Sequence, residues 1–402
     1  MEQLKINLFN AYYEARKNKR NTYNQLRFEI NYEQELFQLY QEIIDKTYTI
    51  DKSIAFIIDK PVKREIFAAS FKDRVIHHLI FNYINPLLEK QFIEDSYSCR
   101  VGKGTLFGIK RAENFMKQCS ENFTQDCYVL KLDIQGYFMS IDKHLLKNKL
   151  VCMLSEHEFN TQICHNTTNK PEQDLSYSTL WWLIDLVVFN DSTKDCIIKG
   201  KLSDWKNLPL SKSLFYSQPY CGLPIGNLTS QLFSNVYLYS FDKWIKTHCT
   251  IKYYGRYVDD FFIIDNNKEY LIYLLAEIKN YLLSNDKLII HPKKIYLQQY
   301  SKGFLFLGAY IKPYRTYIGN KTKIKFKAMV NEYVNYFEKK TVNEQTVLQF
   351  RNSINSYFGI LKHYKTYNLK LKTLFKKQPN PLYNYGFFTT NLHIYKIRKN
   401  EH

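Results

Sequence analysis

Residues 254–264 read Tyr-Gly-Arg-Tyr-Val-Asp-Asp-Phe-Phe-Ile-Ile, and two adjacent acids, Asp259 and Asp260, stand between two apolar and aromatic runs. This pattern predicts two strands joined by a tight turn with both carboxylates at its tip. Neighbouring carboxylates repel each other unless a cation lies beside them, and Mg²⁺ binds carboxylate oxygens together with substrate phosphates. A plain solvated Asp-Asp turn explains the same residues, so this stretch alone leaves both interpretations open.

Another acid interrupts a strand earlier in the chain. Residues 128–142 read Tyr-Val-Leu-Lys-Leu-Asp-Ile-Gln-Gly-Tyr-Phe-Met-Ser-Ile-Asp, in which apolar residues surround Asp133. A charge inside such a strand is costly unless it is paired or binds a metal. Asp133 and Asp259 together would supply the carboxylates of a two-metal site for in-line phosphoryl displacement. The alternative is a structural Asp that caps a helix beginning near Gly136.

A glycine-containing loop lies between these two segments. Residues 221–235 read Cys-Gly-Leu-Pro-Ile-Gly-Asn-Leu-Thr-Ser-Gln-Leu-Phe-Ser-Asn. The first part is typical of a loop, and a helix is expected from Ser230 onward, because Leu232 and Phe233 begin an apolar face. A glycine such as Gly226 before a helix lets a base or a phosphate approach the backbone closely. By itself this spacing is a weak signal.

Taken in chain order, these three segments resemble the motifs of a reverse transcriptase. The strand that ends near Asp133 matches polymerase motif A, residues 226–231 resemble motif B, and residues 257–260 are similar to motif C in its most typical form. The resemblance implies an α+β protein with the right-hand polymerase architecture of fingers, a palm with an antiparallel sheet, and a helical thumb. It also implies the activity of an RNA-directed DNA polymerase.

Further segments extend the resemblance over nearly the whole chain. Residues 60–67 and 71–78 resemble the fingers block of bacterial reverse transcriptases of the group II intron lineage, and residues 95–104 resemble the segment that follows it. Residues 291–294 stand where motif D is expected, and residues 306–311 resemble the primer-grip motif. The correct order of all these motifs makes the resemblance specific.

The resemblance implies that Asp133 and Asp259 bind two catalytic Mg²⁺ ions, for which Mn²⁺ can substitute, with Asp260 beside them and the carbonyl of Ile134 assisting. Asp133, Asp259 and Asp260 are therefore the implied catalytic residues. Phe138 falls at the position that packs under the incoming sugar, where a bulky ring clashes with a 2′-hydroxyl and so selects deoxynucleotides. An ordinary core aromatic is the alternative interpretation of Phe138.

Other motif positions imply contacts with substrates. Arg and Lys suit a triphosphate because phosphate oxygens accept charge-assisted hydrogen bonds, although surface solvation is the alternative for any single residue. Lys293 or Lys294 is the implied proton donor to the leaving pyrophosphate. The implied dNTP-binding residues are Lys63, Arg64, Arg74, Phe138, Gly226, Ser230, Gln231 and Lys293. The implied nucleic-acid-binding residues are Arg100, Tyr257, Gly308, Lys323 and Lys325.

Motif B departs from the form found in many reverse transcriptases. Those enzymes have Gln before the glycine and Ser-Pro after it, whereas this chain has Ile225 before Gly226, and Ser230 is followed by Gln231. This form is similar to that of reverse transcriptases from diversity-generating retroelements. Because an apolar residue removes the polar contacts of the Gln with the nucleotide, low fidelity of base selection is a hypothesis for this chain.

Composition supports a polyanionic partner. The chain has 402 residues, and Lys plus Arg exceeds Asp plus Glu by 57 − 38 = 19. A strongly basic protein of this size typically binds nucleic acid. The 34 Tyr and 28 Phe suit stacking on bases, although an AT-rich genome also enriches Tyr. The eight cysteines lack zinc spacing and are expected to be reduced. With no apolar leader and no apolar run long enough to span a membrane, the expected location is the cytoplasm.

Four domains are predicted along the chain. They are an N-terminal helical extension at 1–50, fingers at 51–125, a palm at 126–312 with an elaboration at about 150–220, and a helical thumb with a basic tail at 313–402. Within them, strand 54–58, helix 75–88 and an apolar helix from Trp181 are expected. No appended nuclease domain is expected.

The predicted partners are a template RNA, the DNA product, dNTPs and either an accessory protein or further copies of the chain, without a membrane. Two biological roles remain open at this point. One is the mutagenic copying of a template repeat in a diversity-generating retroelement, and the other is anti-phage defence with a dedicated non-coding RNA. An inactive polymerase fold that only binds RNA, and an RNA-dependent RNA polymerase, are the rival functions.

Overall fold

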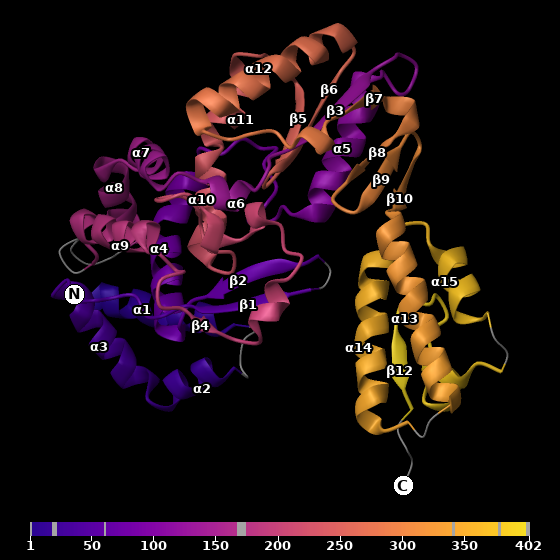
Figure 1. The fold of residues 1–402 in the computed structure, drawn as a ribbon, viewed down its shortest axis with the longest axis horizontal. Coiled ribbons are helices and arrows are strands. Elements are labelled where there is room, and N and C mark those ends of the chain that lie inside the picture. The colour runs from indigo at the N-terminus through magenta and orange to yellow at the C-terminus, as the bar shows by residue number, and fades with distance from the viewer. Residues whose placement is uncertain are drawn as a thin grey trace. The chain divides into compact units, whose positions relative to one another are not determined.

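The computed structural model describes residues 2–17, 22–59, 62–166, 174–339, 342–376 and 379–398 (Figure 1). The chain divides into two compact units. The first unit comprises residues 1–108 and 130–297, and the second comprises residues 109–129 and 298–402. These units do not coincide with the four predicted domains, whose boundaries stay a prediction.

Three helices open the first unit, as the sequence predicts for residues 1–50. They are α1 (Glu2–Arg16), α2 (Tyr23–Ile30) and α3 (Tyr32–Ile44), and α1 and α2 pack against α4 (Phe71–Glu89). α3 buries Leu36, Leu39, Tyr40 and Ile43, a stripe with helical spacing. α4 begins where the Ser70 hydroxyl accepts a hydrogen bond from the backbone N–H of Asp73 at 3.1 Å. The predicted helix 75–88 is confirmed within α4.

A small sheet follows these helices. The predicted strand β1 (Ile54–Ile58) is confirmed, and it pairs antiparallel with β2 (Arg64–Ala68). On its other edge β1 pairs in parallel with β4 (Ile197–Ile198), so the order is β2-β1-β4 (Figure 1). β4 comes from the predicted palm elaboration. This elaboration also contains α8 (Glu156–Asn166), α9 (Tyr177–Phe189) and the 3₁₀ turns η2 (Leu202–Trp205), η3 (Leu210–Lys212) and η4 (Leu214–Tyr216), and α7 (Lys143–Met153) precedes α8.

The central sheet has four strands in the order β5-β6-β3-β7. These are β3 (Tyr128–Asp133), β5 (Tyr253–Tyr257), β6 (Asp260–Asp265) and β7 (Tyr296–Gln299). Residues Phe261 to Ile264 of β6 are all buried, because both faces of this strand are covered. The covering helices include α11 (Tyr239–Thr247), whose Phe241 ring lies 5.3 Å from that of Phe261. The remaining elements of this unit are α6 (Tyr137–Ser140), α10 (Leu228–Tyr237), α12 (Lys268–Asp286) and η5 (Pro292–Lys294).

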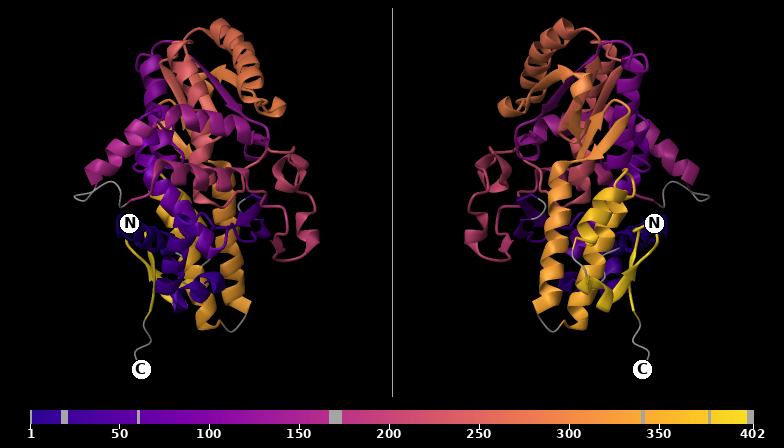
Figure 2. Two further views of the ribbon diagram at one scale, coloured as in Figure 1. Left: turned by 90° about the vertical axis from the view of Figure 1, so that its left-hand side faces the viewer. Right: turned by 90° about the vertical axis from the view of Figure 1, so that its right-hand side faces the viewer.

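The second unit contains a three-stranded antiparallel sheet and a helical bundle. The sheet has the order β10-β9-β8, from β8 (Phe304–Phe306), β9 (Ala309–Lys312) and β10 (Arg315–Ile318). The helices α13 (Asn320–Lys339) and α14 (Glu344–Leu361) lie side by side (Figures 1 and 2). The other elements are α15 (Tyr367–Leu374), η6 (Tyr300–Lys302), η7 (Pro381–Asn384) and the hairpin of β11 (Gly386–Phe388) and β12 (Tyr395–Ile397), and most of α5 (Thr105–Cys119) belongs here too.

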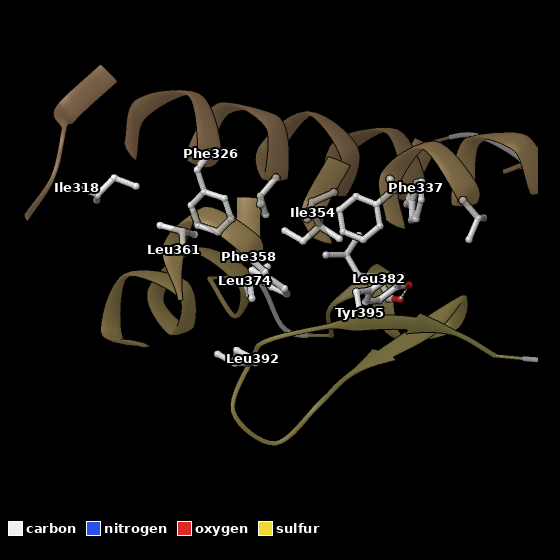
Figure 3. Close-up of a cluster of buried hydrophobic side chains, with 14 residues drawn as sticks. Ile318, Phe326, Phe337, Ile354, Phe358, Leu361, Leu374, Leu382, Leu392 and Tyr395 are labelled. Carbon is white, nitrogen blue, oxygen red and sulfur yellow. Dashed lines mark hydrogen bonds between the residues drawn. The ribbon is translucent and has the colours of Figure 1, made fainter. Parts of the chain in front are cut away.

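The helical bundle has its own apolar core, which includes the C-terminal hairpin. Phe326 and Phe337 of α13 point toward Ile354 of α14, with Leu382 and Tyr395 on the opposite side (Figure 3). The Tyr395 hydroxyl donates a hydrogen bond of 2.7 Å to the Leu382 carbonyl. Full burial of an apolar side chain such as that of Phe326 stabilises the folded state by about 1.5–3 kcal/mol relative to its exposure. The C-terminal residues 379–398 are therefore a structural part of the bundle.

Secondary structure predicted from local patterns is confirmed at the strands around the acids, at α10 and at the apolar helix α9. The seven cysteines whose side chains the structure describes are all free thiols, as predicted. Among the described residues, no helix combines the length and the apolar character that crossing a membrane requires.

Candidate active site

The two adjacent acids occupy the tip of the β5–β6 hairpin, as the sequence predicts. Strand pairing ends with Tyr257 opposite Asp260, so Val258 and Asp259 form the two-residue turn. Val258 has φ of 58°, a left-handed conformation that is rare for a β-branched residue. Such strain persists only where surrounding contacts impose it.

Arg256 supplies such a contact. Its guanidinium is completely buried and donates a hydrogen bond of 2.9 Å from Nη1 to the Val258 carbonyl. The same guanidinium forms a bidentate ion pair with Asp242 of α11, with Nε–Oδ1 at 2.7 Å and Nη2–Oδ2 at 2.5 Å. The Tyr254 hydroxyl also donates to Asp242, at 2.5 Å. Arg256 therefore ties the strained turn to a helix behind the sheet.

Asp133 lies at the end of β3, the strand next to β6. The backbone N–H of the following residue, Ile134, donates to the Asp259 carbonyl at 3.1 Å, and the Asp133 carbonyl accepts from the N–H of His291 at 2.8 Å. Burial, and then the charges of Asp133 and Asp260, raise the pKa of Asp259 to about 6. The fold thus brings the three predicted acids within electrostatic range of one another.

Two lysines form ion pairs with two of these acids. Lys294 Nζ lies 2.7 Å from Asp133 Oδ1, and Lys131 Nζ lies 2.6 Å from Asp260 Oδ1. Burial raises the pKa of Asp260, and the charge of Lys131 opposes this shift. Of the two motif D lysines, the structure thus brings Lys294 to the acids. Lys293 is exposed, and its backbone N–H bonds to the His291 ring.

The donors at this site are those that Mg²⁺ prefers. Asp133 and Asp259 present hard carboxylate oxygens at the ends of neighbouring segments, and their mutual repulsion is visible in the raised pKa of Asp259. Within the described parts of the chain, no three or more His, Cys, Asp or Glu side chains form a ready metal cage. Mg²⁺ usually takes one or two protein carboxylates and completes its shell with water and substrate phosphates. The residues present therefore fit such a substrate-completed site.

The motif B loop is attached to β2. The Phe67 N–H donates to the Ile225 carbonyl at 3.0 Å. Gly226 has φ of 132°, and a Cβ there would lie 3.1 Å from the Phe67 carbonyl oxygen, so glycine permits this close approach. Beyond it, Ser230 is buried in α10 and Gln231 is exposed. Gln231 is thus the more accessible of these two predicted nucleotide contacts.

Phe138 stands in the short helix α6, directly after the turn that follows Asp133. It is half-buried and packs against a cluster that includes Phe67 and Leu214, and Ile225 packs against the same cluster. Its carbonyl accepts a hydrogen bond of 2.8 Å from the N–H of Leu223. The predicted sugar-contacting ring and the unusual motif B residue therefore pack against the same cluster.

The side chains predicted to contact the triphosphate differ in their exposure and in their hydrogen-bonding partners. Lys63 Nζ donates to the Lys206 carbonyl at 2.8 Å. Arg64 is exposed and close to Tyr257. Burial raises the pKa of Tyr257, and the nearby Arg64 charge partly opposes this shift. Arg74 is half-buried, burial lowers its pKa, and its side chain makes no hydrogen bond or ion pair with the described residues. Residues 60 and 61, at the start of the predicted fingers block, lie outside the described residues.

Arg100 has a structural setting that the sequence does not reveal. Its side chain bonds to Glu89 at 2.7 Å and to the Ser96 carbonyl at 3.0 Å, and it lies over the Phe92 ring. Only 5% of this side chain is exposed. Because its donors are satisfied internally, we leave Arg100 out of the nucleic-acid interface.

The second unit holds the remaining predicted residues. Gly308, with φ of 80°, forms the β8–β9 turn, and its carbonyl accepts from the Gly319 N–H at 2.8 Å. Lys323 and Lys325 are half-buried on α13. A groove of about 960 Å³ lies in this unit between α5, the β9–β10 hairpin and the segment after α14. Its basic and aromatic lining comprises Lys110, Lys117, Phe123, Lys312, Tyr314, Arg315, His363, Tyr364 and Lys365.

Comparison with known families identifies the class of protein that this fold and site define. The sequence model of the family described as reverse transcriptase (RNA-dependent DNA polymerase) matches residues 58–311. The match spans more than half of the chain, so the protein belongs to this family. Its helices and antiparallel sheets form the right-hand polymerase architecture of class α+β, as the sequence predicts. No curated protein matches the chain.

Several solved structures are similar to this chain at low identity. Apo telomerase from Candida tropicalis has 12% identity and a TM-score of 0.48, with 84% of this chain and 64% of that chain covered. The same protein without its C-terminal domain has 14% identity and a TM-score of 0.45, with coverage of 70% and 59%. Telomerase from Candida albicans with a fragment of telomeric RNA has 11% identity and a TM-score of 0.41, covering 85% and 61%. This chain thus spans about 59–64% of these telomerase chains, and no conclusion on function rests on them.

Proposed function

We propose that this protein is an RNA-directed DNA polymerase that adds dNTPs to the 3′-hydroxyl of a primer. The observation that carries the proposal is the meeting of Asp133, Asp259 and Asp260 at the ends of adjacent segments. Lysines at hydrogen-bonding distance pair with two of these acids, Asp133 and Asp260. A cluster of acids with exchangeable cationic partners suits a site that admits divalent ions together with a triphosphate.

Asp133 and Asp259 would hold two Mg²⁺ ions, with Asp260 and the Ile134 carbonyl beside them. When bound, these ions supply activation of the attacking hydroxyl and stabilisation of the leaving oxygen. Lys294, which pairs with Asp133 in this structure, would give up this partner to the ions. Its ammonium group remains next to the site and is our candidate for donating a proton to the departing pyrophosphate.

Triphosphate binding is assigned to three basic side chains of the first unit, Arg74, Arg64 and Lys63. Arg74 is a half-buried guanidinium without a hydrogen-bonding partner among the described residues, a state that favours binding of an anion. Arg64 is exposed and close to Tyr257 of motif C. Lys63 would have to leave the Lys206 carbonyl before it contacts a phosphate.

Template and primer binding is assigned to the groove in the second unit. Its lysines and arginine attract phosphates, and its rings can stack on bases. Contacts of charged groups with phosphates and of aromatic rings with bases do not depend on the base sequence. We therefore expect this groove to bind nucleic acid without sequence preference.

Substrate selection is assigned to Phe138 and Ile225. The ring of Phe138 would exclude a 2′-hydroxyl, and the apolar Ile225 would give weak control over base pairing. Copying with many errors would place the protein in a diversity-generating retroelement, whereas faithful copying of a bound structured RNA would place it in anti-phage defence. Sequencing the products and any RNA that co-purifies distinguishes the two roles.

The test is primer extension on an RNA template, with dNTPs or rNTPs and with Mg²⁺ or a chelator. We expect DNA synthesis that requires the divalent ion and prefers dNTPs. Absence of synthesis on every template would favour an RNA-binding protein with an inactive polymerase fold. Preference for rNTPs would instead identify an RNA polymerase.

A further inference from the structure

Residues 197–216, here called the cover segment, begin with β4, which pairs with β1. Beyond this strand, a buried carboxylate attaches the segment to the sheet. Glu65 of β2 is 1% exposed, and its Oε1 accepts hydrogen bonds of 2.7 Å from Trp205 Nε1 and from the Ser213 hydroxyl. Its Oε2 accepts a hydrogen bond of 2.5 Å from the Leu214 N–H. A buried carboxylate is tolerated because all these donors satisfy it, and each donor belongs to the cover segment.

The cover segment packs against the predicted sugar-contacting residue. Leu214 belongs to the buried cluster against which Phe138, Trp205 and Ile225 all pack. Phe215 extends this contact, with its ring 5.4 Å from that of Phe67 on β2. The residues next to Glu65 are thus also those that support Phe138 and Ile225.

The backbone of the cover segment also lies directly on the turn before Phe138. Gly136 has φ of 57°, and a Cβ there would lie 2.6 Å from the Ser211 carbonyl oxygen. The Gly136 carbonyl in turn accepts from the N–H groups of Met139 at 2.9 Å and Ser140 at 3.1 Å. A shift of the cover segment therefore moves or loosens the short helix that carries Phe138.

We infer that Glu65 is a positioning residue for sugar selection, which acts by fixing the cover segment against the helix that carries Phe138. It contacts no substrate itself. This inference rests on the proposed polymerase function and assigns a role to the elaboration of the palm. Steric selection requires the ring to be held within about 0.5 Å of its position, so a loosened support admits the larger sugar.

Three variants separate this role from general destabilisation. Glu65→Gln keeps the shape of the side chain but replaces one accepting oxygen by an NH₂ group. This group cannot accept the hydrogen bonds that the cover segment donates. Trp205→Phe removes one donor and keeps an aromatic ring in the cluster. Asp204→Ala is the control, because Asp204 is exposed and, among the described residues, accepts only from the Lys201 N–H in the same segment.

The first measurement is the ratio of kcat/KM for an rNTP to that for the matching dNTP. We expect Glu65→Gln to raise this ratio about tenfold and Trp205→Phe to raise it less, with kcat/KM for the dNTP within about threefold of wild type. Asp204→Ala should leave the ratio unchanged. In a Phe138→Ala background Glu65→Gln should add nothing, because the ring that it positions is absent. An unchanged ratio in folded Glu65→Gln, or an equal rise in the Phe138→Ala background, would overturn the inference.

The second measurement needs no catalysis. Hydrogen exchange of peptides covering residues 137–141 should be faster in Glu65→Gln than in wild type or Asp204→Ala, while the 257–260 turn keeps its wild-type rate. If wild type incorporates no nucleotide, the proposed function fails, and this comparison still decides whether Glu65 fixes the helix. Unchanged exchange at 137–141 would overturn the inference on its own.

Discussion

Replacing Arg256 by Met tests whether the buried ion pair holds the catalytic turn. Arg256 and Asp242 are both buried, with 0% and 1% exposure, and the substitution leaves the Asp242 carboxylate with the Tyr254 hydroxyl as its hydrogen-bonding partner. Removing one member of a buried pair costs about 3–5 kcal/mol. The lost hydrogen bond to the Val258 carbonyl adds about 1 kcal/mol.

Urea unfolding followed by tryptophan fluorescence measures this loss. All four tryptophans, Trp181, Trp182, Trp205 and Trp244, belong to the first unit, so the signal reports that unit.

We expect Arg256→Met to lower the free energy of unfolding by roughly 4–6 kcal/mol. The double variant with Asp242→Asn should lose less, because no unpaired charge remains. Nucleotide incorporation per folded molecule should also fall in Arg256→Met, since the Val258 turn relaxes. Lys243→Met, on the exposed side of α11, is the control and should change stability by less than about 0.5 kcal/mol. A cost below about 1 kcal/mol for Arg256→Met, or a double variant as unstable as the single one, would refute the argument.

Three further outcomes are expected. Gly136→Ala should destabilise the first unit by about 1–3 kcal/mol in the same unfolding assay, because it combines a positive φ with a clash, and wild-type stability would contradict this. Burial raises the pKa of Asp73 to about 6, so the folded state disfavours its ionised form. The free energy of unfolding of wild type should therefore fall relative to that of Asp73→Asn by up to roughly 3 kcal/mol as pH rises from about 4 to about 6.5, and parallel pH profiles would contradict this. In the groove, Lys312→Ala and Lys365→Ala should each reduce the slope of log affinity for an RNA–DNA duplex against log salt by about 0.9, as measured by anisotropy. A slope unchanged from wild type would remove the groove from the interface.

Local patterns in the sequence predict much of the fold. The apolar runs on both sides of Asp259 and before Asp133 predict strands because a strand that is covered on both faces is apolar at successive positions, and both predictions are confirmed. The helix that follows Gly226 is confirmed for a similar reason, since its apolar face has helical spacing.

Residues whose role depends on distant partners could not be predicted in this way. Glu65 accepts hydrogen bonds from residues 140 and 148 positions later in the chain. The sequence around Glu65 does not indicate these partners. Lys131 and Arg256 are visible as charges within apolar runs, but their ion-pair partners become known only from the fold. Arg100 has a basic side chain in a motif, and only the fold shows that its donors are already satisfied.

The basic groove of the second unit illustrates the same limit. Its lining comes from α5, from the β9–β10 hairpin and from the segment after α14, which are far apart in the sequence. Lys323 and Lys325 of α13, which are predicted nucleic-acid contacts, are not part of this lining. Charge alone therefore predicts that the protein binds a nucleic acid. The fold is needed to locate the groove that is the candidate binding surface.

Incorporation of a single dNTP on an RNA template, with Mg²⁺, by Asp259→Asn and Glu269→Gln is the most direct test of the proposed chemistry. Both variants remove one carboxylate charge from the first unit, and Glu269 is exposed on the first turn of α12. We predict a loss on the order of a thousandfold for Asp259→Asn, which corresponds to about 4 kcal/mol of transition-state stabilisation, with unfolding behaviour close to wild type. Glu269→Gln should retain wild-type incorporation. Full activity in folded Asp259→Asn would contradict the assignment of this turn as the catalytic centre.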